Sequence, residues 1–236
     1  MDMQSNNNLF EVINNNFKKH FQSGCNCIES LYHYTTKSAL FGIMETKGIR
    51  ISNVNYFDDR LELDFGIRLA IGKLKELCYR KNYDEFFFTI EHQILKFYLN
   101  KNDYYVFSTC LNKDNSYLSK NYSNQNGCII GFEKKWLIDC NEQGLCNNGF
   151  VDTLDNKIYY NYELEYGKVI YDREKQEEII IEYIEELYKN WRIQKSEIHT
   201  GFLALDLSVF LLMFKTEAYK YENELRLIFH RHSKGF

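Results

Sequence analysis

Two glutamates near the end of the sequence, Glu222 and Glu224, are spaced so that they could act together on one ligand. The segment 222–230 has the pattern of a β-strand, and side chains two positions apart on a strand point to the same face. Arg226 would share that face and could balance the negative charges. The alternative is a surface ladder that neutralises itself in water. On the first interpretation, the pair provides a rigid acceptor beside a cation.

A histidine stands inside the aromatic segment 31–35, just before an expected helix. The alternation of residue types predicts a strand, and Thr35 or Thr36 could cap the helix that follows. A histidine at such a strand-to-helix turn is well placed for chemistry, whereas a partly buried, hydrogen-bonded histidine is the structural alternative. His33 is therefore a candidate that needs partners from elsewhere in the chain.

The composition argues against several classes of protein. The 236 residues carry a net charge of -4 with a pI of about 5.9, so there is no global basic footprint for nucleic acid. The seven cysteines lack the spacing of a zinc site or a disulfide framework, so we expect reduced thiols and no metal. No signal-peptide pattern opens the sequence, and the most apolar segment, 202–214, is too short to span a bilayer. These features predict a cytoplasmic protein without a membrane partner.

The hydrophobic pattern predicts an α+β fold. Residues 1–30 form an expected helical lead-in, and residues 31–236 one domain with a helical insertion at about 60–100. Helices are expected, from apolar residues that recur every three or four positions, at 63–78, 87–98, 173–191 and 202–214. Strands are expected, from β-branched and aromatic residues, at 31–36, 49–51, 104–110, 127–132, 156–162, 166–171 and 222–230.

Four blocks of the sequence, taken in order, resemble the bacterial family catalogued as domain of unknown function 2971. The resemblance runs from about residue 31 to residue 230, and its blocks are 31–35, 55–62, 107–132 and 214–226. The chain departs from the family pattern at Arg60, Ser119 and Leu225, where the family commonly has proline, tryptophan and an aromatic residue.

A strand with Tyr-His-x-Thr, a middle tyrosine and a late strand glutamate also resemble the His-Tyr-Glu arrangement of ADP-ribosyltransferases. That resemblance implies a split, mostly antiparallel sheet with flanking helices that grips NAD. It implies that His33 hydrogen-bonds the ribose, that Tyr122 stacks on nicotinamide, and that Glu224 stabilises the oxocarbenium ion formed as the glycosidic bond breaks. The other residues expected to contact NAD are Tyr32, Thr35, Tyr56, Ser108 and Arg226.

Two roles stay open between candidates: Tyr56 could stack in place of Tyr122, and Glu222 could be catalytic in place of Glu224. The resemblance implies an NAD-dependent ADP-ribosyltransferase, a toxin or anti-phage defence effector that modifies a nucleic acid or a protein. The alternatives are an NAD glycohydrolase and a non-catalytic module that binds a nucleotide or a partner. The transferase interpretation requires the side chains of His33 and Glu224 to face one site.

Overall fold

The chain folds into two compact units, each assembled from three segments of the sequence. The helical unit contains residues 1–23, 58–101 and 169–219, and the sheet unit contains residues 24–57, 102–168 and 220–236. The expected single domain from residue 31 stays a prediction, because two compact units can belong to one domain or to two. The computed structural model describes residues 14–57, 60–82, 84–99, 104–122, 127–139, 150–151, 158–159, 162–194, 207 and 209–231.

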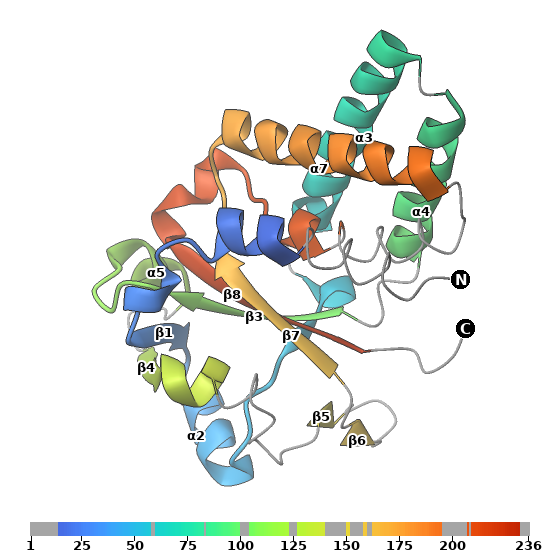
Figure 1. Cartoon of the computed structure of the whole chain (residues 1–236). Helices are drawn as coiled ribbons and strands as arrows, with labels where there is room; N and C mark the ends of the chain where they lie inside the picture. Colours follow the sequence, from blue (N-terminus) through green and yellow to red (C-terminus); the bar gives the residue numbers. More distant parts are fainter. Residues whose placement is uncertain are drawn as a thin grey trace. The chain divides into compact units, whose positions relative to one another are not determined.

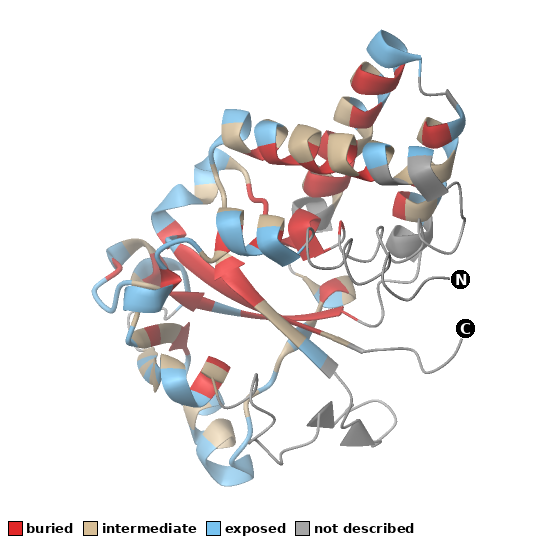
Figure 2. Ribbon diagram, viewed as in Figure 1, coloured by how far each residue is buried: buried red, intermediate tan, exposed pale blue. Residues whose placement is uncertain are grey.

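The helical unit is built from amphipathic helices. Its three long helices are α3 (Arg60–Lys81), α4 (Asp84–Leu99) and α7 (Arg173–Gln194), as Figure 1 shows. Shorter helices lie at 14–21 and 209–212. The periodicity predicted helices over 63–78, 87–98 and 173–191, and the structure confirms them. In Figure 2, buried and exposed residues alternate along α3 and α7, as expected for helices with one face in a core.

Aromatic rings form much of the core of the helical unit. Phe21 is fully buried, and its ring centroid lies 5.2 Å from that of Phe210 and 5.9 Å from that of Phe214. Tyr183 on α7 contacts Phe210 at 4.7 Å. The segment predicted as a buried helix over 202–214 is buried where it is described and helical up to residue 212, while residues 202–206 and 208 lie outside the described residues.

A buried glutamine joins two segments of the helical unit. Gln176 donates from its Nε2 to the carbonyl oxygens of Ile170 and Lys215, at 2.6 and 2.7 Å. The same segments meet in a parallel bridge between Ile170 and Phe214. The carbonyl oxygen of Ile170 also accepts from the amide of Lys215 at 3.2 Å, so the glutamine adds to a direct connection between the two segments.

One glycine allows two helices of this unit to approach closely. A Cβ atom at Gly66 on α3 would lie 2.7 Å from the carbonyl oxygen of Leu211, which is shorter than a normal van der Waals contact. Apart from its chain neighbours and the backbone of its own helix, Gly72 on the same helix has no atom within 4 Å of the corresponding position. Gly66 is therefore required by packing, and Gly72 is not.

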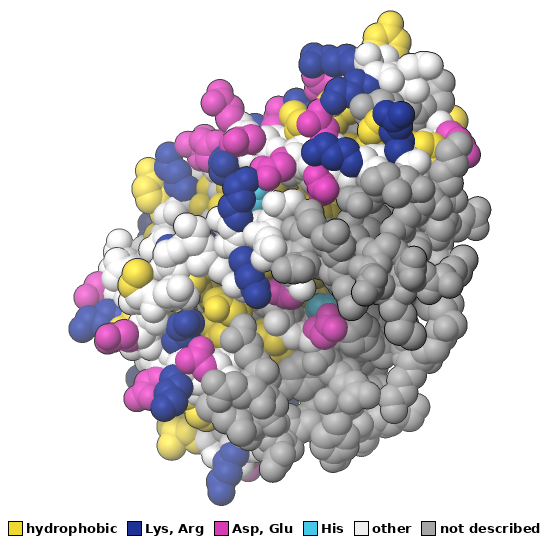
Figure 3. Space-filling model, in the orientation of Figure 1, with side chains coloured by type: hydrophobic (Ala, Val, Ile, Leu, Met, Phe, Trp, Pro, Cys, Tyr) yellow, Lys and Arg dark blue, Asp and Glu magenta, His cyan; other side chains and the backbone are white. Residues whose placement is uncertain are grey.

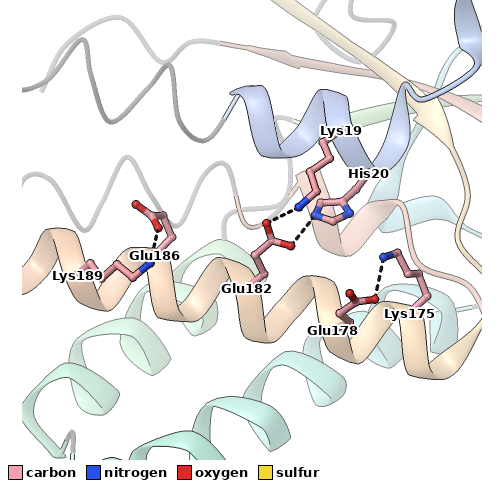
Figure 4. A network of polar contacts seen from close by, with 7 residues as sticks. All are labelled: Lys19, His20, Lys175, Glu178, Glu182, Glu186 and Lys189. Carbon is pink, nitrogen blue, oxygen red and sulfur yellow. Dashed lines mark hydrogen bonds and ion pairs between the residues drawn. The ribbon is translucent and has the colours of Figure 1, made fainter.

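A histidine of helix 14–21 contacts the acidic side of α7 (Figure 4). His20 places its Nε2 3.1 Å from Oε2 of Glu182, while the Nζ of Lys19 donates to Oε1 of the same carboxylate at 2.7 Å. The side chain of His20 is only 4% exposed. Burial lowers the pKa of His20, and the Glu182 carboxylate opposes that shift. The neutral imidazole is therefore the form that suits the folded chain.

Acidification is expected to weaken the fold through His20. Near its ordinary pKa of 6.5 the unfolded chain binds more protons at this position than the folded chain does, so the free energy of unfolding rises with pH through that region and levels off above it. Burial also lowers the pKa of His33, which adds a slope of the same sign. Urea unfolding between about pH 5.5 and 7.5 measures the slope, which should decrease in His20→Gln and decrease further in the double variant with His33→Gln. A slope that His20→Gln leaves unchanged would contradict this account.

The sheet unit contains an open, antiparallel, six-stranded sheet, so the fold is α+β as predicted. The strand order is β4-β1-β3-β8-β7, and β2 also pairs with β3. The strands are β1 (Ser30–Thr35), β2 (Ser52–Asn53), β3 (Tyr104–Cys110), β4 (Cys128–Glu133), β7 (Tyr162–Lys168) and β8 (Glu224–Arg231). Two short strands, β5 (Phe150–Val151) and β6 (Ile158–Tyr159), pair separately. The strand predicted at 49–51 lies instead at β2.

Short helices accompany the strands of the sheet unit. They are η1 (Cys25–Cys27), α2 (Lys37–Thr46), η2 (Val54–Tyr56), α5 (Ser116–Tyr122) and the π-helical turn η4 (Lys135–Asp139), and η5 (Glu217–Glu222) precedes β8. Thr36 caps α2 as predicted, because its Oγ1 accepts from the amide of Ala39 at 3.2 Å. Lys47, with φ of 53°, ends that helix.

The strands β1 and β3 meet at one residue pair, Tyr32 opposite Cys110. By contrast, β1 pairs with β4 along its whole length, and β3 pairs with β8 along its whole length. The sheet is therefore least continuous between β1 and β3.

The surface shows no broad region of a single charge on the face drawn in Figure 3, where acidic and basic side chains are interspersed over the described residues. Among the helices of the described part of the chain, none combines the length and the apolar content needed to cross a membrane.

Candidate functional site

The first candidate carboxylate, Glu222, does not lie on a strand. It is the last residue of η5, and Asn223 after it adopts a left-handed conformation with φ of 48°. Strand β8 begins only at Glu224. The prediction that Glu222 and Glu224 alternate along one strand is therefore wrong, because the left-handed residue between them breaks the two-residue period.

The second carboxylate, Glu224, forms a buried ion pair with Arg226. The guanidinium donates from Nε to Oε1 at 2.7 Å and from the second terminal nitrogen to Oε2 at 3.1 Å. The residues are only 5% and 2% exposed. Burial lowers the pKa of Arg226 to about 9, so the guanidinium is charged at neutral pH. The solvated ladder considered from the sequence is not what the chain forms.

An exposed tyrosine contacts the first carboxylate. Tyr122, the last residue of α5, donates from its hydroxyl to Oε1 of Glu222 at 3.2 Å. The tyrosine is 48% exposed, whereas Glu222 is 4% exposed. A solvent-exposed ring is thus hydrogen-bonded through its hydroxyl to a buried carboxylate.

Asn115, which was not among the residues predicted from the sequence, connects helix α5, which ends at Tyr122, to the turn that contains Glu222. Its Nδ2 donates to the carbonyl oxygens of Tyr221 and Glu222, at 2.7 and 3.3 Å. Its Oδ1 accepts from the amide of Leu118 at 3.1 Å, which caps the start of α5. The available signal was an asparagine directly before a possible helix start, a position typical of a cap.

Tyr34 is a second residue that the sequence analysis did not select. Its hydroxyl accepts from the amide of Asn115 at 2.7 Å and donates to the carbonyl oxygen of Lys113 at 2.6 Å. Tyr34 and Cys110 also pack with Leu118 in a small buried cluster. Its only signal was its place in the aromatic strand, which does not distinguish it from a core residue.

The strand registers decide which candidates share a face. Tyr32 lies opposite Cys110, and Cys110 lies opposite Glu224, so these three residues point to the same side of the sheet. Alternation extends that side along each strand. We call it the carboxylate face, and it carries Tyr32, Tyr34, Ser108, Cys110, Glu224 and Arg226. The name also includes the adjoining contact between Tyr122 and Glu222, because the Nδ2 of Asn115 lies 3.5 Å from Sγ of Cys110 and 3.3 Å from the carbonyl oxygen of Glu222.

His33 lies on the opposite face of the sheet from Glu224. Its ring contacts Phe107 with centroids 4.8 Å apart, and its Nδ1 lies 3.1 Å from the carbonyl oxygen of Ser108. Burial lowers the pKa of His33. Thr35 shares this side by alternation. The expectation that His33 and Glu224 face one site is therefore wrong, and the structure does not support the His-Tyr-Glu geometry.

The remaining candidates divide in the same way. The side chain of Ser108 is exposed in the middle of β3, and its cross-strand neighbour on the carboxylate face is Arg226. Tyr56 lies on η2 and is 70% exposed, and it is Tyr122, not Tyr56, that the structure brings to Glu222. The carboxylate face thus combines an exposed aromatic ring, an exposed hydroxyl, two carboxylates and one guanidinium.

No group of three or more histidine, cysteine, aspartate or glutamate side chains suited to a metal ion occurs in the part of the chain that the structure describes. The described cysteines, Cys25, Cys27, Cys78, Cys110 and Cys128, are all free thiols. Cys140 and Cys146 lie outside the described residues. The carboxylate face itself offers the exposed hydroxyl of Ser108, the Glu224–Arg226 ion pair, the Glu222 carboxylate and the exposed ring of Tyr122.

A family model described as "Protein of unknown function (DUF2971)" matches residues 120–227 of this chain. The matched part contains Tyr122, Glu222, Glu224 and Arg226, and it begins after His33. The match supports the family over that part, while the blocks at 31–35 and 55–62 lie outside it. No curated protein and no solved structure matches the chain.

Proposed function

We propose that the sheet unit binds a nucleotide on the carboxylate face and that the oxidised form of NAD is its ligand. The observation that carries the proposal is the solvent-exposed ring of Tyr122, held by its hydroxyl on the buried Glu222. Exposed aromatic rings stack on planar bases, and carboxylates accept hydrogen bonds from ribose hydroxyls. One residue pair therefore offers a partner for each half of a nucleoside.

The charge of the carboxylate face favours a cationic ring. The Glu224 carboxylate accepts from two nitrogens of the Arg226 guanidinium, while the Glu222 carboxylate accepts from the hydroxyl of Tyr122. The negative charge of Glu222 therefore lies at the edge of the exposed ring. The nicotinamide of oxidised NAD carries a positive charge that the reduced form lacks, so this charge favours the oxidised form.

Calorimetric titration with oxidised and reduced NAD tests the proposal. We expect the oxidised form to bind more tightly, and Tyr122→Ala to weaken binding by roughly tenfold or more, because stacking on a base is worth about 1–3 kcal/mol. Tyr56→Ala is the matched control, since it removes another exposed tyrosine. Equal binding of Tyr122→Ala and wild type, or no binding of either cofactor, would rule out the proposed role.

A second candidate function is ADP-ribosyl transfer from NAD to a nucleic acid or a protein, as a toxin or a phage-defence effector would perform it. It is favoured by the Glu222 carboxylate, which contacts the candidate stacking ring while the carboxylate of Glu224 is paired with Arg226. The arrangement that paired His33 with Glu224 fails, because these side chains lie on opposite faces of the sheet. A different arrangement takes its place here, in which Glu222 stabilises the oxocarbenium ion and His33 has no part.

Labelled NAD, incubated with the protein and a mixture of cell extract, DNA and RNA, separates binding from catalysis. Label on a macromolecule that disappears in Glu222→Gln supports transfer, and release of free ADP-ribose alone supports a glycohydrolase. Binding without any turnover leaves the non-catalytic module as the function.

A further inference from the structure

We infer that Asn115 is the positioning residue of the carboxylate face, which sets the place of Glu222 relative to the ring of Tyr122. The inference deepens the proposed function and rests on it for the ligand, but its geometric part can be measured without any ligand. Asn115 touches neither the hydroxyl of Tyr122 nor the carboxylate of Glu222 through a described contact. It acts instead on the two backbone segments that carry them.

The oxygen and the nitrogen of the Asn115 side-chain amide contact two different backbone segments. Its Oδ1 accepts from the amide of Leu118 at 3.1 Å, which fixes the start of α5, the helix that ends at Tyr122. Its Nδ2 donates to the carbonyl oxygens of Tyr221 and Glu222, at 2.7 and 3.3 Å. A single planar group therefore fixes the helix that presents the ring and the turn that presents the carboxylate.

The turn at Glu222 needs such support because regular secondary structure ends there. Glu222 closes η5, Asn223 is left-handed with φ of 48°, and β8 starts at the next residue. The amide of Leu111 donates to the carbonyl oxygen of Asn223 at 3.2 Å. The segment around Asn115 thus holds this turn from both sides of Glu222.

Tyr34 fixes Asn115 in turn. Its hydroxyl accepts from the backbone amide of Asn115 at 2.7 Å and donates to the carbonyl oxygen of Lys113 at 2.6 Å. Asn115 is buried, so the hydrogen bonds of its side-chain amide and of its backbone amide are protected from competing water. Tyr34 of strand β1 is therefore connected to Glu222 by hydrogen bonds that run through Asn115.

Replacement of Asn115 by serine separates capping from positioning. Serine is a good helix cap and keeps α5, but its hydroxyl is too short to reach the carbonyls of Tyr221 and Glu222 while it caps. Asn55→Ser is the matched control, because Asn55 makes its side-chain contact with Asn53 instead. Tyr34→Phe is a second test of the same path, since it keeps the ring and removes the hydroxyl.

The first measurement is the carboxyl ¹³C signal of Glu222 in protein labelled at glutamate, assigned by its absence in Glu222→Gln. We expect Asn115→Ser and Tyr34→Phe to shift this signal, and Asn55→Ser to leave it in place. The second measurement is the affinity for oxidised NAD, which should fall about tenfold in Asn115→Ser, the usual effect of losing one well-formed hydrogen bond.

An unchanged Glu222 signal in a folded Asn115→Ser or Tyr34→Phe variant overturns the inference, whatever the protein binds. A shifted signal in a protein that does not bind NAD supports the positioning role and defeats the proposed ligand. A fall in thermal stability with an unchanged Glu222 signal means that Asn115 is a structural cap only, and it counts against the inference.

Discussion

Replacement of Arg226 by methionine is expected to lower the free energy of unfolding by about 3–5 kcal/mol, which is the usual cost of removing one partner from a buried ion pair. The carboxylate of Glu224 would stay in the interior without the two nitrogens that now donate to it at 2.7 and 3.1 Å. Methionine fills a similar volume, so the effect reports lost charge compensation and not a cavity. Urea unfolding at neutral pH measures it.

The double variant Glu224→Gln/Arg226→Met is the control for this experiment. It removes both charges, so it should recover most of the stability that the single variant loses. The free energy of unfolding of Arg226→Lys should lie between those of wild type and Arg226→Met, because a lysine keeps the charge but cannot form both hydrogen bonds. If the single and double variants unfold at the same urea concentration, the ion pair does not make the contribution assigned to it.

Replacement of Gly66 by alanine is expected to destabilise the helical unit by about 1–3 kcal/mol, the usual cost of overpacking. The added methyl group would lie 2.7 Å from the carbonyl oxygen of Leu211, so the backbone of one helix must move. Gly72→Ala is the matched control on the same helix, and it should stabilise the protein by up to about 1 kcal/mol, since alanine favours a helix and nothing lies within 4 Å.

Thermal or urea unfolding of the two glycine variants gives the comparison directly. The two substitutions are the same chemically, so opposite signs can come only from their surroundings. A Gly66→Ala protein as stable as Gly72→Ala would mean that α3 and the segment of Leu211 do not approach as closely as the structure describes.

The helices were predictable because their signal is local. In α3 and α7 the apolar residues recur every three or four positions, and no distant contact is needed to recognise that pattern. The end of β8 nearest the site was not predictable in this way. The residues from Glu222 to Arg226 alternate in type like a strand, but the left-handed Asn223 removes Glu222 from it.

Which residues share the site could not be predicted, because it depends on the register between paired strands, and a single sequence does not show that register. A two-residue period shows that His33 points away from both of its neighbours, but the register of Tyr32 opposite Cys110 decides which side of the sheet it occupies. A shift of that pairing by one residue would have placed His33 with Glu224. Asn115 and Tyr34 were missed because their importance comes from contacts with Glu222 and with each other, which are far apart in sequence.

The interleaving of the two units along the sequence has a consequence for synthesis in the cell. Each unit draws on three separate segments, so neither can be completed while only the first half of the chain has left the ribosome. Strand β8 lies between β3 and β7, so these two strands have no common neighbour until residues 224–231 have been made. Because the exposed edges of an incomplete sheet invite aggregation, we expect the nascent chain to be prone to aggregation until β8 has been made.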